Sequence, residues 1–148
     1  MVVLSVLIVS ILAARGLGAV GLDLLASWPA SVRAGLAVML LFTASAHFSR
    51  MKADLVRMVP PKIRHPLAIV YFTGVCEIAG AIGLLVPATR QIAALSLIVY
   101  FVVVFPANVR ADRERVTLRG KPATPLWLRL PMQLLFIVLS WWSGVYRS

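Results

Sequence analysis

Six polar side chains stand inside long apolar stretches of this 148-residue chain, where a polar site within a membrane would need them. They comprise a histidine, a threonine, a carboxyl group, two amides and an arginine: His47, Thr73, Glu77, Asn108, Gln133 and Arg129. Ionisable and amide groups are costly at membrane depth, so they face a bundle interior or a cavity. Such a set suggests the binding of a polar head group or the handling of a proton.

Glu77 lies deepest of the six. It comes 11 residues after Pro66, about 16 Å along a helix that rises about 1.5 Å per residue, and therefore near the membrane midplane. Thr73 lies one turn earlier on the same face. A lone carboxyl group at this depth stays protonated or finds a cation or a hydrogen-bond donor. The alternative is a neutral glutamic acid that only links helices.

Arg129 and Gln133 are spaced i, i+4 and lie on one face of the last apolar segment. Arg129 has three possible roles: it pairs with Glu77, holds an anionic head group, or extends into the lipid headgroups. Gln133 is deeper and needs a partner inside the bundle.

His47 ends the segment from residue 32, with Thr43 one turn before it. It is either a solvated helix-end residue or a group that binds a ligand or exchanges a proton. Asn108 follows Pro106, which frees a backbone carbonyl, so Asn108 either repairs the helix or contacts a ligand. With Arg129 and Gln133 these residues fall on one side of the membrane, and Glu77 lies deeper. We therefore expect a single inward-facing polar pocket.

The elements that position these residues are membrane helices. The chain is 61% hydrophobic and 14% charged, against about 45–50% and about 25% in soluble domains, which excludes a water-soluble or a disordered protein. Four stretches approach or reach the length of about 20 residues that crosses a membrane: 32–48, 66–86, 91–109 and 126–146.

A fifth stretch, 1–26, is apolar for 14 residues and is then interrupted by Arg15, three glycines and Asp23. It forms either one long helix that buries Arg15 and Asp23 or a shorter helix followed by a broken segment. The predicted fold class is all-α, a transmembrane helical bundle with a four-helix core in residues 28–148. Residues 1–27 form an N-terminal hydrophobic helix, which we expect to be a fifth span.

The net charge of +10 reflects topology rather than nucleic-acid binding, because the basic residues collect in two connections, 50–65 and 110–125. With Arg129, the side of these connections holds 11 of the 15 lysines and arginines, and the other side holds Arg15, Arg33, Arg90 and Arg147. The positive-inside rule makes the first side cytoplasmic. Five spans then place the N-terminus inside and the C-terminus outside.

Metal and disulfide chemistry are not expected. Cys76 is the single cysteine, which excludes an intrachain disulfide and a CxxC motif. Two histidines cannot make a three-histidine metal site, and the second, His65, lies in a proline-flanked loop, so we expect neither a metal nor haem.

An ordered set of segments resembles the DoxX family of small bacterial membrane proteins across about residues 32–145. The segments are Ala46-His47-Phe48, Met58-Val59-Pro60-Pro61, Tyr71 to Glu77, Phe105-Pro106-Ala107-Asn108 and Leu128 to Gln133. Ser45 departs from the small glycine-type residue that relatives often carry there. The resemblance implies a four-helix core, a bacterial inner-membrane location and membrane redox complexes as the setting. It also implies that His47, Glu77, Asn108, Arg129 and Gln133 occupy family motif positions.

Three functions remain open. The first is a subunit that binds a quinone or similar lipophile and anchors a cytoplasmic oxidoreductase through the 50–65 and 110–125 loops, surrounded by membrane lipids. The second is a non-enzymatic scaffold or assembly chaperone. The third is a small proton-coupled transporter, for which a homo-oligomer would supply the second half. No self-sufficient catalytic motif is present, so enzymatic activity stays undecided.

Overall fold

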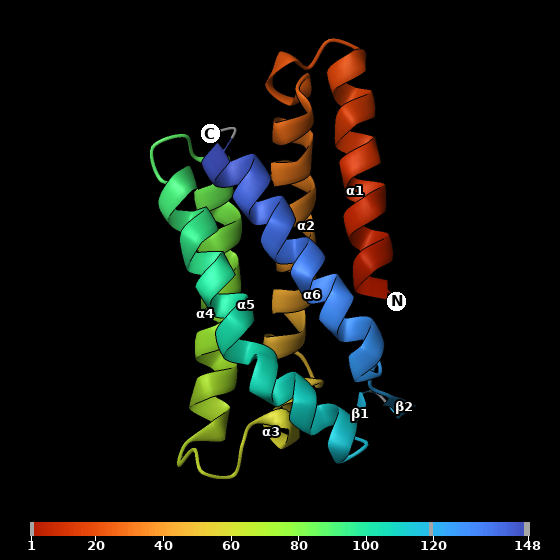
Figure 1. Cartoon of the computed structure of the whole chain (residues 1–148), viewed down its shortest axis with the longest axis vertical. Coiled ribbons are helices and arrows are strands. Elements are labelled where there is room, and N and C mark those ends of the chain that lie inside the picture. Colours follow the sequence, from red (N-terminus) through yellow and green to blue (C-terminus); the bar gives the residue numbers. More distant parts are fainter. Residues whose placement is uncertain (1, 119, 147–148) are drawn as a thin grey trace.

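The computed structural model describes residues 2–118 and 120–146. Arg119 and Arg147, which enter the charge count above, lie outside this range, as do Met1 and Ser148. Five long helices run along the molecule (Figure 1): α1 (Val2–Ala19), α2 (Trp28–Phe48), α4 (Pro66–Leu85), α5 (Arg90–Arg113) and α6 (Leu126–Trp141), the last continued by a π-helical turn, η2 (Trp142–Tyr146).

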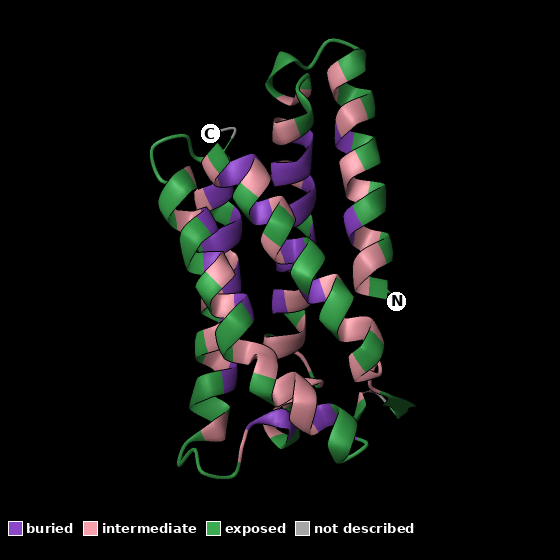
Figure 2. Cartoon of the chain, viewed as in Figure 1, coloured by how far each residue is buried: buried purple, intermediate pink, exposed green. Residues whose placement is uncertain are grey.

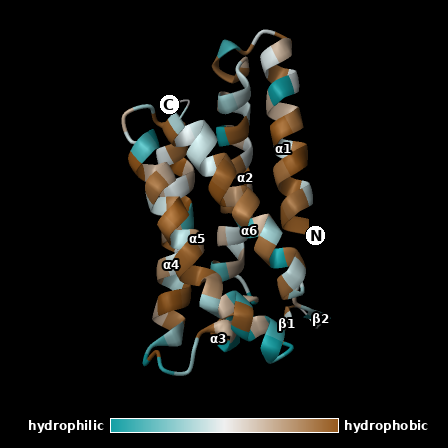
Figure 3. Cartoon of the chain, viewed as in Figure 1, coloured by the Kyte–Doolittle hydropathy of each residue, from teal (hydrophilic) through white to brown (hydrophobic). Residues whose placement is uncertain are grey.

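The five long helices, with α6 taken through its π turn, are each long and apolar enough to cross a membrane, which makes this a multi-pass membrane protein with an all-α helical bundle fold. Hydrophobic residues occupy the middles of these helices, and hydrophilic ones gather toward their ends (Figure 3). Much of this apolar surface is exposed on the isolated chain (Figure 2). Such a surface is compatible with contact to lipid.

Helix α2 is central to the packing. It contacts α1 on one side and α4 on the other, and it also meets η2, while α5 joins α4 to α6. The core therefore centres on α2 residues such as Leu36 and Leu40, with Leu84 and Leu97 opposite them. Helix α1 is peripheral, because only Leu7 and Ala14 are buried along its length.

The N-terminal segment forms a single helix that ends at Ala19. Arg15 remains helical and places its guanidinium 5.4 Å from the centre of the Trp28 ring. The chain then turns at Gly21, whose φ of +112° suits glycine, and passes through the 3-10 turn η1 (Asp23–Leu25). Asp23 is exposed. Of the two alternatives, the segment therefore matches the shorter helix followed by a broken segment. The break comes after Ala19, so Arg15 stays within the helix.

A serine and a proline mark the starts of two helices. The side chain of Ser27 caps α2 by accepting from the Ala30 amide at 3.3 Å, and Pro66 stands in the first turn of α4. The connection between α4 and α5 is a tight turn, and these two helices are neighbours.

Both basic connections contain elements that the sequence did not reveal. A short helix, α3 (Lys52–Met58), lies in the first, and a two-stranded hairpin of β1 (Thr117–Leu118) and β2 (Lys121–Pro122) lies in the second. They share a small apolar cluster of Met58, Ala111 and Val116. The two loops therefore form one packed unit at this end of the bundle.

The approach of α4 to α2 depends on Gly74. A Cβ atom at this position would lie 2.7 Å from the Cβ of His47 and 2.9 Å from Cε2 of Phe48, whereas Gly16 on α1 has nothing within 4 Å. We expect Gly74→Ala to destabilise the bundle by about 1–3 kcal/mol relative to Gly16→Ala, because overpacking separates two helices.

Thermal unfolding of both variants in the same detergent measures the difference. Each gains the same helix propensity from alanine, so only the contact with α2 separates them. Equal melting temperatures would show that α2 and α4 do not pack this closely.

Candidate functional site

Glu77 is held by side chains of two neighbouring helices. Thr43 Oγ1 on α2 lies 2.9 Å from Glu77 Oε2, and the hydroxyl of Tyr100 on α5 donates to Glu77 Oε1 at 2.7 Å. His47 Nε2, also on α2, lies 3.7 Å from Oε2. The Glu77 side chain is 9% exposed. A buried carboxyl group thus joins α2, α4 and α5 within the apolar part of the bundle.

The His47 ring is oriented by the backbone of α4. Its Nδ1 lies 2.7 Å from the carbonyl oxygen of Val70 and 3.2 Å from Thr73 Oγ1. A carbonyl oxygen only accepts hydrogen bonds, so Nδ1 carries a proton and donates it there. The nitrogen that faces Glu77 is therefore Nε2, which accepts in a neutral ring and donates in an imidazolium.

One proton decides the state of the Glu77–His47 pair. With the proton on Nε2, the pair is a carboxylate beside an imidazolium; with the proton on Oε2, it is a carboxylic acid beside a neutral ring. Thr43 adapts to both states, because its hydroxyl lies within reach of Glu77 Oε2 and, at 3.0 Å, of the Leu40 carbonyl. The hydrogen bonds of Thr43 are therefore compatible with either arrangement.

A second network links α5 and α6. Arg129 Nη1 donates to Asn108 Oδ1 at 2.8 Å, and Asn108 Nδ2 donates to Gln133 Oε1 at 3.2 Å. Gln133 Nε2 in turn donates to the carbonyl oxygen of Phe101. The network forms one chain of hydrogen bonds from the end of the bundle into its interior.

This chain ends one residue before the carbonyl that Pro106 leaves without its helical partner. A proline removes the amide that would bond the carbonyl four residues earlier, here that of Val102. Gln133 donates to the carbonyl of the preceding residue, Phe101, on the turn that Pro106 opens. The Gln133 bond therefore lies beside the carbonyl that Pro106 leaves without its amide, and Asn108 bonds Gln133 and Arg129 rather than this backbone.

The start of α6 is fixed by Asp112 at the end of α5. Its Oδ1 accepts from the amide of Leu126 at 2.9 Å, which supplies the cap that Pro125 lacks. Arg129, three residues after this capped start, is half-buried and bonds Asn108.

The six predicted residues fall into two hydrogen-bond networks rather than one pocket. His47, Thr73 and Glu77 belong to the first, and the other three belong to the second. Arg129 bonds Asn108, and no ion pair of Arg129 with Glu77 occurs in the described part of the chain. The two networks meet on α5 at the adjacent residues Tyr100 and Phe101, whose ring centres are 5.7 Å apart.

Sequence reasoning missed Tyr100, although a phenol in the middle of an apolar segment is itself a signal. It also missed a polar contact at the opposite end of the bundle. There the buried Arg33 on α2 donates from Nη1 to the Ser143 carbonyl at 2.6 Å. Arg90 Nε, near the start of α5, is buried without a hydrogen bond among the described residues.

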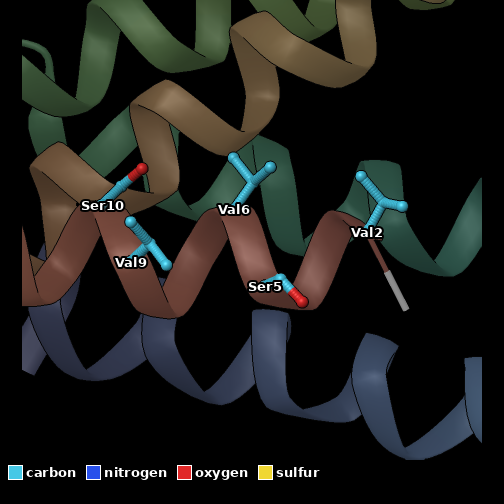
Figure 4. Close-up of a pocket in the computed structure, with 5 residues that line it drawn as sticks. All are labelled: Val2, Ser5, Val6, Val9 and Ser10. Carbon is cyan, nitrogen blue, oxygen red and sulfur yellow. The ribbon is translucent and has the colours of Figure 1, made fainter.

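Two shallow surface hollows lie away from both networks. One is lined by five residues of α1 (Figure 4): Val2, Ser5, Val6, Val9 and Ser10. The other lies at the end of α5 beside Pro60. In residues 2–118 and 120–146, no three or more histidine, cysteine or acidic side chains are grouped so that they could hold a metal ion.

Replacing Glu77 tests whether its partners depend on it. In Glu77→Gln, the amide oxygen accepts from Tyr100 and the amide nitrogen donates to Thr43 or to neutral His47, so we expect little loss of stability. Glu77→Leu leaves the Tyr100 hydroxyl unpaired in an apolar interior, while Thr43 keeps the Leu40 carbonyl, and it should cost about 1–3 kcal/mol. Thermal unfolding in detergent checks both variants. A Gln variant as unstable as the Leu variant would contradict this hydrogen-bond assignment.

Comparison with known proteins identifies the family. No curated protein and no solved structure matches the chain at a significant level. Residues 36–144 match a family described as "Domain of unknown function (DUF8561)". This region contains all six predicted site residues together with Thr43 and Tyr100, and it begins within α2. Because the match covers most of the chain, the protein belongs to this family of unknown function.

Proposed function

We propose that this protein is a DoxX-like membrane subunit that binds the polar head of a quinone-class lipophile and exchanges a proton with it through Glu77 and His47. The observation that carries the proposal is the Glu77–His47 pair, 3.7 Å apart, beside the Tyr100 hydroxyl in the apolar interior. An ionisable pair at membrane depth is expensive and marks a functional site by default.

The donors of this cluster suit a ring with carbonyl oxygens. Tyr100 and a protonated His47 both donate hydrogen bonds, and Glu77 or His47 supplies or accepts a proton. Two-electron reduction of a quinone to a quinol takes up two protons, and the electrons would come from a separate oxidoreductase. The role of this chain is confined to binding the head group and moving protons at Glu77 and His47.

A partner of that kind has a surface available. Helix α3 and the β1–β2 hairpin pack together through Met58, Ala111 and Val116, so the two basic loops present one platform. A packed platform that carries many arginines and lysines favours an acidic partner surface. This observation supports the proposed docking of a cytoplasmic oxidoreductase.

Quinone binding can be tested in nanodiscs that contain a known fraction of ubiquinone or menaquinone. We expect enrichment of quinone with the wild-type protein and a reduction of about two- to tenfold in Tyr100→Phe, the size expected for one hydrogen bond. We expect a comparable reduction in Glu77→Gln, because its amide can neither supply nor accept a proton. Asp23→Asn is the matched control, because it exchanges an exposed acid for an amide outside both networks.

Equal quinone content in all four proteins, or no enrichment in the wild type, would contradict the proposal. Melting temperatures measured on the same samples separate loss of binding from loss of folding. The Gln variant is suited to this purpose because its amide keeps the hydrogen bonds of the cluster.

A second candidate is a non-enzymatic membrane scaffold. One observation favours it: the predicted site residues all have hydrogen-bond partners within the protein, and together they cross-link α2, α4, α5 and α6. Under this alternative the variants change stability alone, and the quinone content of the nanodiscs stays at the bulk value. Activity would then depend on the two basic loops.

We further propose that the protein lies in a bacterial inner membrane with the basic loops in the cytoplasm. In a Cys76→Ala background, Ala88→Cys in the α4–α5 turn should react with a membrane-impermeant maleimide in intact cells. Arg64→Cys in the opposite connection should react only after permeabilisation. Both positions are exposed, so accessibility within the fold does not separate them. The reverse labelling pattern would overturn this orientation.

A further inference from the structure

The residues that line the hollow at the end of α5 divide into an apolar set, which we call its floor, and a charged set, which we call its rim. Phe105, Pro106 and Val109 contribute to its floor. Arg110 and Arg113, in the last turn of α5, and Glu114 form its rim. The apolar part belongs to the membrane-crossing helix and the charged part to its end, so the hollow lies where lipid tails give way to headgroups. Hydrophilic residues gather at this end of α5 in Figure 3.

One arginine of the rim has no acidic partner among the described residues. Arg110 is fixed, because its Nε bonds Glu114 Oε1 at 2.8 Å and its Nη1 donates to the Val59 carbonyl. This pairing uses the negative charge of Glu114. Arg113 is exposed and makes no ion pair with any residue in the described part of the chain. The hollow therefore presents one uncompensated guanidinium above an apolar floor.

An apolar stripe of α5 leads into the same hollow. Ile92, Leu95, Val99 and Val102 are exposed at helical spacing along one face, and Pro106 continues it to the rim. A soluble partner would contact the rim alone. A molecule with a negative head and a long apolar tail matches both the stripe and the guanidinium.

We propose that this hollow binds a single anionic phospholipid, with its phosphate against Arg113 and one acyl chain along the exposed stripe of α5. Basic residues at a helix end also serve the helix dipole and the general attraction to anionic membranes. These two general effects do not account for the hollow, because the Arg113 guanidinium, the fixed Arg110 and the apolar floor all line the same hollow. It is separate from the Glu77 cluster, and the quinone proposal does not depend on it.

Native mass spectrometry of the protein from mixed micelles tests the site. The micelles contain equal amounts of phosphatidylglycerol and phosphatidylethanolamine, and the retained lipids are counted. We expect one phosphatidylglycerol held by the wild type and about fivefold weaker retention in Arg113→Gln, the effect of one basic side chain at an anionic surface. Arg64→Gln is the matched control, since it removes one exposed charge from the same end of the bundle and does not line the hollow.

Three outcomes would overturn the proposal. Equal losses in Arg113→Gln and Arg64→Gln would show general charge attraction only. Equal retention of phosphatidylethanolamine would show that the head group is not recognised. Displacement of the lipid by soluble glycerol phosphate at similar concentration would show a phosphate site that does not use the apolar stripe. Equal melting temperatures of the two variants confirm that both remain folded.

Discussion

A carboxyl group inside a membrane has no water to bond, so Glu77 must find all its partners within the protein. It finds them on two other helices, through Thr43 and His47 on α2 and Tyr100 on α5. This requirement fixes the level at which three helices meet. It also explains why Gly74 faces His47, since the imidazole reaches Glu77 only if the two backbones approach closely. Gly74 and the polar cluster around Glu77 thus both depend on the close approach of α2 and α4.

The same rule governs the backbone. Pro106 removes the amide partner of the Val102 carbonyl in α5, and Gln133 from α6 donates to the adjacent carbonyl of Phe101. At the opposite end, Arg33 donates to the carbonyl of Ser143 in the π-helical turn that ends the bundle. Helical irregularities in this protein therefore coincide with side-chain contacts between helices, and these contacts hold the core together at both ends.

The spans could be predicted because length and hydropathy decide them. The start of α2 could not, because Ser27 caps it at Trp28, before the apolar stretch that begins at residue 32. The individual site residues were identifiable, since a glutamate or glutamine inside an apolar run is conspicuous. Their partners were not, because rotation about each helix axis decides whether Arg129 reaches Glu77 or Asn108. Likewise, α3 and the hairpin are short, and the packing of Met58 against Ala111 and Val116, rather than a sequence pattern, stabilises them.

Long helices that follow one another along the chain pack against one another, and one long-range contact joins α2 to the end of the bundle. Helix α1 pairs with α2, α2 with α4, α4 with α5, and α5 with α6, so each helix can pack on an earlier one as it is synthesised. The bond from Arg33 to Ser143 spans 110 residues and closes the series. A nascent chain that has inserted α2 already carries Arg33, but it gains this acceptor only when the π-helical turn after α6 has entered the membrane. The bundle therefore stays open on this side until all of its helices have inserted.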